Sequence, residues 1–348
     1  MESRARVPLA PLTTLRLGGP AGRLVEAAGA AEIAEAVAAA DAAGEPVLLL
    51  GGGSNLVLAD EGWPGTVVLI RSTGTVLRSD GDERTLVVEA GEPWDDLVAR
   101  TVYEGWAGLE CLAGIPGLTG ATPVQNVGAY GQEVADTVSS VTAYDRRTAE
   151  VRRMTPGDCR FGYRDSVFKH SDRYVVLSVS FVLRATDKSG PVRYAELART
   201  LGVEVGEVAP LREVCEAVLS LRRGKGMVID AADPDTWSVG SFFTNPVLDA
   251  AGLAALEGRL EPGTAYPSWP AAGGRKLSAA WLIERCGFGK GYGGEAVRVS
   301  SKHTLALTHR GGGSTAELIA LAREVRDGVR DRFAVTLVPE PRLVGVTV

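Results

Sequence analysis

The sequence predicts a mixed α+β protein of two or three domains. At 348 residues the chain is longer than one hydrophobic core usually serves. Short β-branched runs alternate with segments of helical spacing through the first two thirds, and 45% apolar with 23% charged residues is an ordinary globular composition. Near Met227 the composition shifts toward glycine and proline, so we expect a domain boundary there.

Charge and hydropathy exclude two classes of protein. The net charge of −6 argues against a nucleic-acid binder, which would carry a basic stripe or domain. The N-terminal segment has no continuous apolar stretch, and no apolar run approaches the roughly 20 residues that cross a bilayer. We therefore expect a cytoplasmic protein without a membrane partner.

The cysteines and histidines argue against a metal site or a disulfide framework. Cys111, Cys159, Cys215 and Cys286 are far apart and form no CxxC pair, which is typical of reduced thiols. Only three histidines are present, so we expect no metal.

The first α/β unit frames a glycine turn. Residues 30–43 have helical spacing and end before Gly44, and residues 46–50 and 66–70 are typical of strands. Between these strands comes GGGSN at 51–55, where residues without a Cβ let a ligand approach the backbone N–H groups. No Lys-Ser/Thr follows, so the turn is not a P-loop; it predicts a diphosphate held by loop amides, or simply a turn between strands.

A second unit follows from residue 73. Residues 85–90 predict a strand, and Pro93 with two following acids predicts a helix start. The uncharged, glycine-rich residues 114–131 indicate backbone packed against an extended ligand, or a long structural loop. Residues 175–183 alternate as in a half-buried strand, and a helix from Pro210 ends in Arg222, Arg223 and Lys225, which complement its dipole.

The last third predicts two helices and a closing strand. Residues 276–286 have helical spacing and stop before Gly287. Ser314 and Glu317 predict a capping box at the start of a long amphipathic helix. Residues 335–338 are typical of a strand.

Six motifs occur in one order along the chain: GGGSN at 51–55, IPG at 115–117, PVQNVGAYG at 123–131, CRFGYRDSVFK at 159–169, GSFFTNP at 240–246 and PEPR at 339–342. In these motifs the whole chain resembles the UDP-N-acetylenolpyruvoylglucosamine reductases, the MurB-type flavoenzymes of peptidoglycan synthesis. Tyr194 resembles the branch that covers its site with a tyrosine-bearing loop. The stretch from Lys225 to Ser241 is longer than the family's commonest form.

The resemblance implies a fold and three domains. We expect an α+β chain with a two-subdomain FAD-binding module of the vanillyl-alcohol-oxidase type and a C-terminal α+β substrate-binding domain. The expected subdomains are residues 1–72, joined by the closing segment 336–348, and residues 73–227. Residues 228–335 would bind substrate.

The resemblance also implies the reaction: reduction of an enolpyruvyl ether, with hydride passing from NADPH through FAD to the β-carbon of UDP-N-acetylglucosamine enolpyruvate. Arg164 and Glu340 would clamp the carboxylate of the developing enolate, and Ser241 would donate the final proton. Each residue could instead have a purely structural role: Arg164 could pair with Asp165 at the surface, Ser241 could cap a turn, and Glu340 could be a charge at the end of a strand.

The ligand-binding residues follow from the same motifs. The expected contacts with FAD are Leu50, Gly51, Gly52, Gly53, Ser54, Asn55, Leu56, Pro116, Gly117, Gly120, Ala121, Val124, Asn126, Gly128, Ala129, Tyr130 and Val176. The expected contacts with the UDP-sugar are Tyr194, Lys225, Asn245, Tyr266, Lys276, Lys290 and Arg342. The first set contains no histidine, so we expect non-covalent FAD.

Two other functions fit parts of the pattern. A flavin-dependent alcohol oxidase of the same fold would need no Ser241 donor and would be reoxidised rapidly by air. A non-catalytic flavin- or sugar-nucleotide-binding protein would be expected to lose members of the set Arg164, Ser241 and Glu340, and here all three are present. The sequence does not set the oligomeric state, although a monomer would suffice.

Overall fold

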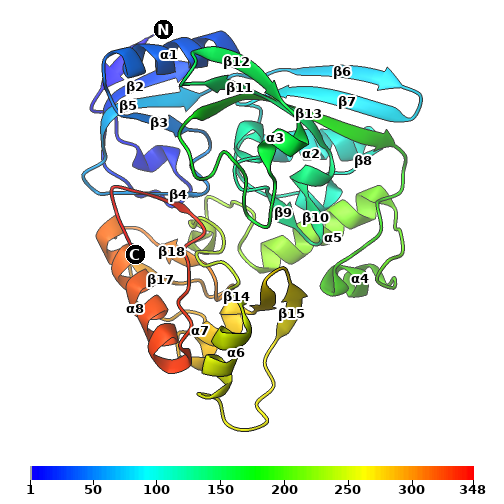
Figure 1. Cartoon of the computed structure of the whole chain (residues 1–348), viewed down its shortest axis with the longest axis vertical. Helices are drawn as coiled ribbons and strands as arrows, with labels where there is room; N and C mark the ends of the chain where they lie inside the picture. Colours follow the sequence, from blue (N-terminus) through cyan, green and yellow to red (C-terminus); the bar gives the residue numbers. More distant parts are fainter. Residues whose placement is uncertain (1) are drawn as a thin grey trace. The chain divides into compact units, whose positions relative to one another are not determined.

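The computed structural model describes residues 2–348 and forms two compact units (Figure 1). Unit 1 consists of the N-terminal segment up to Val7, Ala21–Gly52 and Pro64–Gly224. Unit 2 consists of Pro8–Pro20, Gly53–Trp63 and Lys225–Val348. The chain thus enters unit 2 for the last time close to the boundary expected near Met227. The finer division into two FAD-binding subdomains and a substrate domain stays a prediction.

Among the described residues, unit 1 is built on two larger sheets and a two-stranded sheet of β9 and β10. Its helices are α1 (Ala30–Ala42), α2 (Trp94–Tyr103), α3 (Pro156–Cys159), α4 (Ala195–Leu201) and α5 (Leu211–Gly224). Its strands are β1 (Ser3–Ala5), β2 (Ala21–Ala27), β3 (Val47–Leu50), β5 (Trp63–Ile70), β6 (Thr75–Asp80), β7 (Glu83–Glu89), β8 (Trp106–Ala107), β9 (Gly128–Ala129), β10 (Gln132–Glu133), β11 (Val138–Asp145), β12 (Glu150–Met154) and β13 (Tyr174–Ala185). Within the described residues, one sheet has the order β1-β2-β5-β3, and the other has the order β12-β11-β13-β7-β6, with β8 beside β13.

The predicted helices α1 and α2 are confirmed, and their ends follow local chemistry. Ile33 and Val37, one turn apart, are buried on the inner face of α1. Gly44 takes a φ of +67°, which suits a residue just past a helix end. Two acidic residues lie in the first turn of α2, where the helix dipole favours negative charge.

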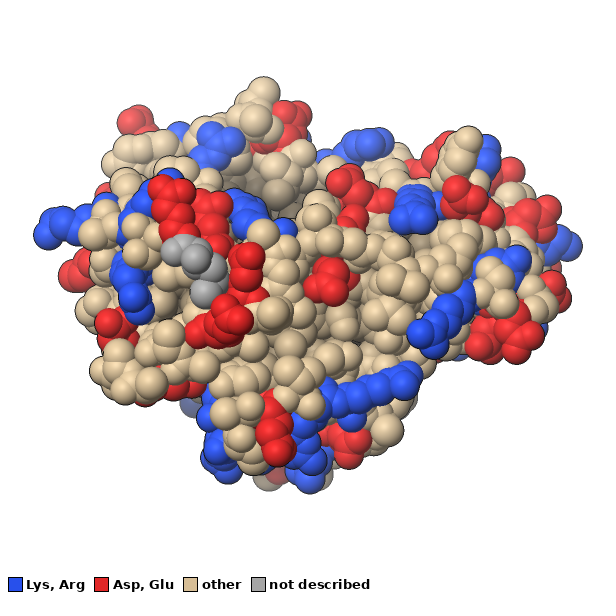
Figure 2. All heavy atoms as spheres, turned by 90° about the horizontal axis from the view of Figure 1, so that it is seen from above, with Lys and Arg blue, Asp and Glu red and all other residues tan. Residues whose placement is uncertain are grey.

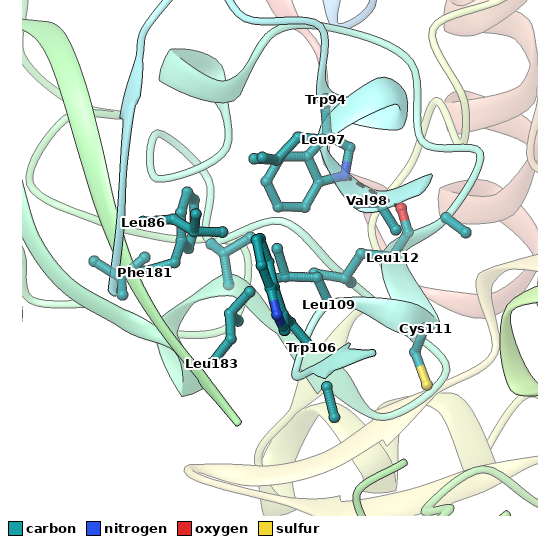
Figure 3. Packing of buried hydrophobic residues seen from close by; sticks show 14 of the residues in the cluster. Leu86, Trp94, Leu97, Val98, Trp106, Leu109, Cys111, Leu112, Phe181 and Leu183 are labelled. Atoms are coloured by element: carbon teal, nitrogen blue, oxygen red, sulfur yellow. Dashed lines mark hydrogen bonds between the residues drawn. The ribbon is translucent and has the colours of Figure 1, made fainter. Parts of the chain in front are cut away.

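The core of unit 1 lies between α2 and the β13 sheet (Figure 3). Trp94 is fully buried, and its ring lies 5.8 Å from that of Phe181 on β13. Its indole Nε1 donates a hydrogen bond to Leu112 O (3.2 Å), so the one polar atom of this large side chain is satisfied. This core anchors the start of the loop 114–131.

The expectation that β13 is half-buried is wrong. Ser178 and Ser180, predicted on a solvent face, are only 8% and 6% exposed. β13 is a central strand, with β11 on one side and β7 on the other, and Leu177 packs into a second cluster with residues of α1. The serine face and the apolar face of β13 are therefore both covered by other parts of the protein.

Unit 2 combines short strands with three α-helices among the described residues. The helices are α6 (Ala250–Glu257), α7 (Ala279–Arg285) and α8 (Thr315–Phe333). The strands are β4 (Leu56–Leu58), β14 (Val247–Leu248), β15 (Ser268–Ala271), β16 (Gly274–Leu277), β17 (Val297–Val299), β18 (Leu307–His309) and β19 (Arg342–Val344). The predicted capping box of α8 is confirmed, with Ser314 and Glu317 bonded reciprocally. β19 pairs in parallel with β4, so the closing segment returns beside the end of the glycine turn.

Two predictions for unit 2 need correction: the helix expected at residues 276–286 is present but begins later, and the strand expected at residues 335–338 is wrong. Lys276 and Leu277 belong to β16, because their backbone pairs with β15 and β14, and helix α7 begins only after Ser278 caps it. Residues 335–338 form no strand, because Pro339 and Pro341 lack the N–H groups that would continue a ladder; the strand instead covers Arg342–Val344.

Helix hydropathy and surface charge bear on membrane and nucleic-acid binding, and the structure describes each of them (Figure 2). Within residues 2–348, no helix has both the length and the apolar character needed to cross a membrane. On the face shown in Figure 2, acidic and basic side chains are interspersed.

Candidate active site

The glycine turn leaves β3 after Leu50 and enters β4 at Leu56. Gly53 takes a φ of +60°, and a Cβ there would lie 2.4 Å from Leu12 O, so this position requires glycine. Asn55 O accepts a hydrogen bond from Arg342 N (3.0 Å), which ties the turn to β19. The turn is therefore a fixed backbone structure.

The loop 114–131 packs against this turn within unit 1. A Cβ on Gly52 would lie 2.9 Å from Gly117 Cα, so the two backbones touch. Further along, Gly120 N donates to Ala90 O (2.8 Å), and a Cβ on Gly120 would meet the Ala90 Cβ at 2.5 Å. Two glycine-rich motifs that are 65 residues apart in sequence thus form one continuous backbone surface.

Asn126 fixes the course of the same loop from inside. It is buried with a φ of +47°, and its Nδ2 donates to Glu133 Oε2 (2.7 Å) and Gly162 O (3.0 Å). Val124 O accepts from Ser166 Oγ (2.6 Å). The remaining residues expected around the cofactor lie in this loop, in the glycine turn or on β13: Pro116, Ala121, Gly128, Ala129, Tyr130, Gly51, Ser54 and Val176.

Arg164 is held in a tight turn of unit 1. Gly162 and Asp165 bond to each other's backbone, and Arg164 between them takes a φ of +53°, a rare conformation for a residue with a Cβ. Its Nη2 donates to Gly128 O (2.7 Å). Asp165, the surface partner considered for it, accepts from His170 Nε2 (2.6 Å). Arg164 is thereby directed toward the loop that carries the cofactor motif.

Two tyrosines and an arginine gather beside this loop. Tyr194, at the N-cap position of α4, lies edge-to-face with Tyr130, with ring centroids 5.5 Å apart. Burial raises the pKa of the Tyr130 phenol to about 12, against the opposing effect of the Arg222 guanidinium. The Tyr130 phenol is thus neutral and able to donate a hydrogen bond at neutral pH.

Arg222 lies in the last turn of α5 and contacts the start of the loop 114–131. It was interpreted as a dipole complement, but its Nη2 donates to Gly114 O (3.2 Å) at the start of the loop. Burial lowers its pKa to about 10, and the charge of nearby Arg164 contributes in the same direction. The signal was available, because Arg222 follows the buried Val218 by four residues and so lies on the same face of α5.

Unit 2 brings Ser241 and Glu340 onto neighbouring segments. Phe243 bridges to Pro339 in antiparallel fashion, and Glu340 N donates to Phe242 O (2.8 Å). Phe242 and its neighbour are almost fully buried, which anchors this pair of segments in the core of the unit. Ser241 Oγ lies 3.4 Å from His303 Nε2, a partner that no sequence motif pointed to.

The residues expected to bind the UDP-sugar are spread over unit 2, apart from Tyr194. Asn245 Oδ1 accepts from Ala279 N (2.9 Å) at the start of α7, and Tyr266 OH donates to Glu257 Oε1 (2.7 Å). Lys276 lies in the middle of a three-stranded sheet of the described residues, whereas Lys290 is exposed. Arg342 begins β19, and Lys225 is the first residue of the last segment of the unit.

The two units correspond to known domain families. Residues 21–155 match the model of an FAD binding domain, and residues 233–344 match the C-terminal domain of UDP-N-acetylenolpyruvoylglucosamine reductase. The reductase of Salinispora arenicola is 59% identical over 345 residues, covering 98% of this chain and 95% of that protein. The chain belongs to the UDP-N-acetylenolpyruvoylglucosamine reductase family.

Other members of the reductase family agree over the same length. The reductase of Saccharopolyspora erythraea is 59% identical over 344 residues, covering 97% of this chain and 94% of that protein. The crystal structure of the reductase (MurB) from Thermus caldophilus is 24% identical, covers 99% of this chain and 98% of that one, and has a TM-score of 0.67. The expected fold class, an FAD-binding module with a C-terminal α+β domain, is confirmed.

The residues of the reductase's glycine turn fit FAD. Gly53 has the positive φ that backbone anion cradles use. Within residues 2–348, neither Gly52 N nor Gly53 N donates a hydrogen bond to another protein group. Backbone N–H groups of this kind are the donors that a diphosphate requires.

Proposed function

We propose that this chain catalyses the NADPH-dependent, FAD-mediated reduction of UDP-N-acetylglucosamine enolpyruvate to UDP-N-acetylmuramate in peptidoglycan precursor synthesis. Membership of the reductase family over nearly the whole chain carries the proposal. The retained Arg164, Ser241 and Glu340 support it, because a binding protein or an alcohol oxidase needs no such set.

The glycine turn and the loop 114–131 would hold the cofactor. The turn would bind the FAD diphosphate through backbone N–H groups, and the loop would line the ribityl chain and the ring. When bound, FAD accepts a hydride from NADPH and passes it to the β-carbon of the enolpyruvyl group. Neither stretch contains a histidine, so FAD would be held without a covalent bond.

Addition of hydride places negative charge on the α-carbon and the adjoining carboxylate. Arg164 would stabilise the charge, because its planar guanidinium is permanently protonated and matches a carboxylate. Glu340 would help by sharing a proton with the developing enolic acid, since a bare carboxylate would repel it. Ser241 would then donate a proton to the α-carbon.

The remaining named residues would bind the nucleotide sugar, a substrate with about three negative charges. Lys225, Lys276, Lys290 and Arg342 supply positive charge within an acidic chain, and Tyr194, Asn245 and Tyr266 supply hydrogen bonds. We further propose that the enzyme works in the cytoplasm, where NADPH and nucleotide sugars are supplied, with no nucleic-acid or membrane partner.

Anaerobic spectroscopy tests the proposal. The purified protein should be yellow, release intact FAD on acid or heat treatment, bleach with NADPH and regain its colour on addition of UDP-N-acetylglucosamine enolpyruvate. Rapid recolouring in air combined with none by the enolpyruvyl substrate would indicate the alcohol oxidase. Absence of flavin after reconstitution would overturn the proposal.

A further inference from the structure

His303 lies on a turn that unit 2 holds rigidly beside Ser241. The turn joins β17 to β18. Ser300 is fully buried, and its Oγ accepts hydrogen bonds from Lys302 N (3.0 Å) and His303 N (3.3 Å). Ala306 N donates to His303 O (3.0 Å), which closes the turn on itself. The backbone that carries the imidazole is therefore fixed.

The long segment before Ser241 clamps this turn from outside. Asp235 accepts hydrogen bonds from Ser301 N (2.9 Å) and Ser301 Oγ (2.5 Å), and Asp233 accepts one from Lys302 Nζ (2.5 Å). Burial alone would raise the pKa of Asp235, but hydrogen bonds from Ser301 and Ser300 and the charge of Arg310 together lower it, so the carboxylate stays ionised at neutral pH.

The same segment connects Ser241 with the turn that carries His303. The segment that holds the turn, residues 230–237, leads within four residues to Ser241 itself. Arg16 stacks on Trp237, with its guanidinium carbon 3.6 Å from the ring centroid, and so pins the end of the segment. Residues 230–237 thus hold Ser241 and His303 on one scaffold.

We propose that His303 is a positioning residue for Ser241, donating its Nε2–H to Ser241 Oγ; this inference rests on the proposed function. The contact of 3.4 Å is long, and such hydrogen bonds tighten when substrate is bound. With Oγ accepting from His303, the serine O–H is left free to point toward the substrate.

The hydrogen bond acts in the proton-transfer step. The serine O–H bond breaks as the C–H bond at the α-carbon forms, which leaves negative charge on Oγ. A fixed N–H donor stabilises that charge as it develops, and a proton from solvent then restores the hydroxyl. His303 itself neither gains nor loses a proton. This partner supplies the assistance that a serine hydroxyl, a weak acid, requires.

Half-reaction kinetics test the proposal. His303→Ala should bleach with NADPH at the wild-type rate but be reoxidised by the enolpyruvyl substrate about 10- to 100-fold more slowly, the loss typical of one hydrogen bond to a charged group. His303→Gln keeps an N–H donor and should stay within about fivefold of wild type. Wild-type reoxidation in His303→Ala would overturn the proposal.

A double variant tests whether His303 acts through Ser241 or directly on the substrate. Ser241→Ala combined with His303→Ala should be no slower than Ser241→Ala alone, because His303 acts through the serine. Losses that multiply would mean that His303 acts directly on the substrate and would overturn the proposal.

His309→Gln is the matched control. His309 is buried on the adjacent β18, but its ring nitrogens bond to the backbone at Leu15 O (3.0 Å) and Gly313 N (3.2 Å). This variant should lower the melting temperature without changing the ratio of the two half-reaction rates. If His309→Gln slowed reoxidation as much as His303→Ala, the effect would be structural and the proposal wrong. Failure of the wild-type enzyme itself to be reoxidised would instead refute the proposed function.

Discussion

Arg164 Nη2 donates a 2.7 Å hydrogen bond to Gly128 O, joining the turn of the YRDS motif to the loop of the GAYG motif. The contact fixes one N–H group of the guanidinium against the loop. Gly128 is closely surrounded, because a Cβ there would lie 2.8 Å from Glu133 Cγ, 3.0 Å from Gln132 O and 3.1 Å from Arg164 Nη1. Arg164 is therefore a preorganised cation.

Arg164→Lys should weaken both binding and chemistry. An ammonium on a flexible stem cannot hold Gly128 O and meet a carboxylate with two parallel hydrogen bonds. We expect the substrate Kd to rise and flavin reoxidation to slow, each by roughly tenfold. Binding is titrated on the oxidised enzyme, and reoxidation is followed by rapid mixing. Arg160→Lys is the control, because Arg160 is exposed and has a similar φ of +51°; an equal loss there would point to a general effect on this segment.

Glu340→Gln should separate binding from chemistry. Glutamine keeps the shape and a hydrogen-bond donor but cannot share a proton with the enolate, so substrate affinity should be nearly retained while reoxidation slows by roughly 10²-fold or more. The same titration and rapid-mixing measurements apply. Glu295→Gln, an exposed change in the same unit, should have no effect. Reoxidation at the wild-type rate in Glu340→Gln would remove Glu340 from the mechanism.

Ser241→Ala should affect only the second half-reaction. The proton is needed after hydride has left the flavin, so bleaching by NADPH should proceed at nearly the wild-type rate. Turnover of the enolpyruvyl substrate should fall by roughly 10²-fold or more, as on removal of a general acid. The measurement is stopped-flow absorbance of each half-reaction. An equal fall in both would mean that Ser241 is structural.

Acid should destabilise unit 1 through Asp145. This buried carboxylate accepts hydrogen bonds from Arg173 Nε (2.8 Å) and Nη2 (2.6 Å), and these bonds hold its pKa well below the usual range. A carboxyl whose pKa is lower in the folded state stabilises the fold above its unfolded pKa of about 4, and that stability is lost as pH falls toward the folded pKa.

Asp145→Asn should therefore lower the melting temperature at pH 7 by several degrees, leaving Arg173 without its carboxylate. Its melting temperature should also fall less steeply than wild type below about pH 4. Thermal melts followed by circular dichroism between pH 3 and pH 7 measure both effects. Asp80→Asn, at an exposed position on β6 of the same sheet, should reproduce the wild-type pH dependence. If the melting temperatures of Asp145→Asn and wild type fell equally steeply with pH, Asp145 would not be the source of the acid sensitivity.

Local signals in the sequence determined the elements whose chemistry is local. The helical spacing of Ile33 and Val37, and the capping box of Ser314 and Glu317, depend on neighbours within one or two turns, so α1 and α8 could be predicted. The motifs likewise determined the family, because their order requires no knowledge of contacts. The glycines of the turn also pointed to close backbone approach by themselves.

Only the tertiary structure decided which faces are buried and which side chains meet. Ser178 and Ser180 are covered because β13 is a central strand, and no alternation in one strand reveals what packs on its second face. His303 contacts Ser241, which lies 62 positions earlier in the sequence. The turn that carries His303 is held by a hydrogen bond from Ser301 N to Asp235, in the segment before Ser241. Such contacts depend on how separate segments pack. The spacing of residues along one segment does not indicate which distant segment packs against it.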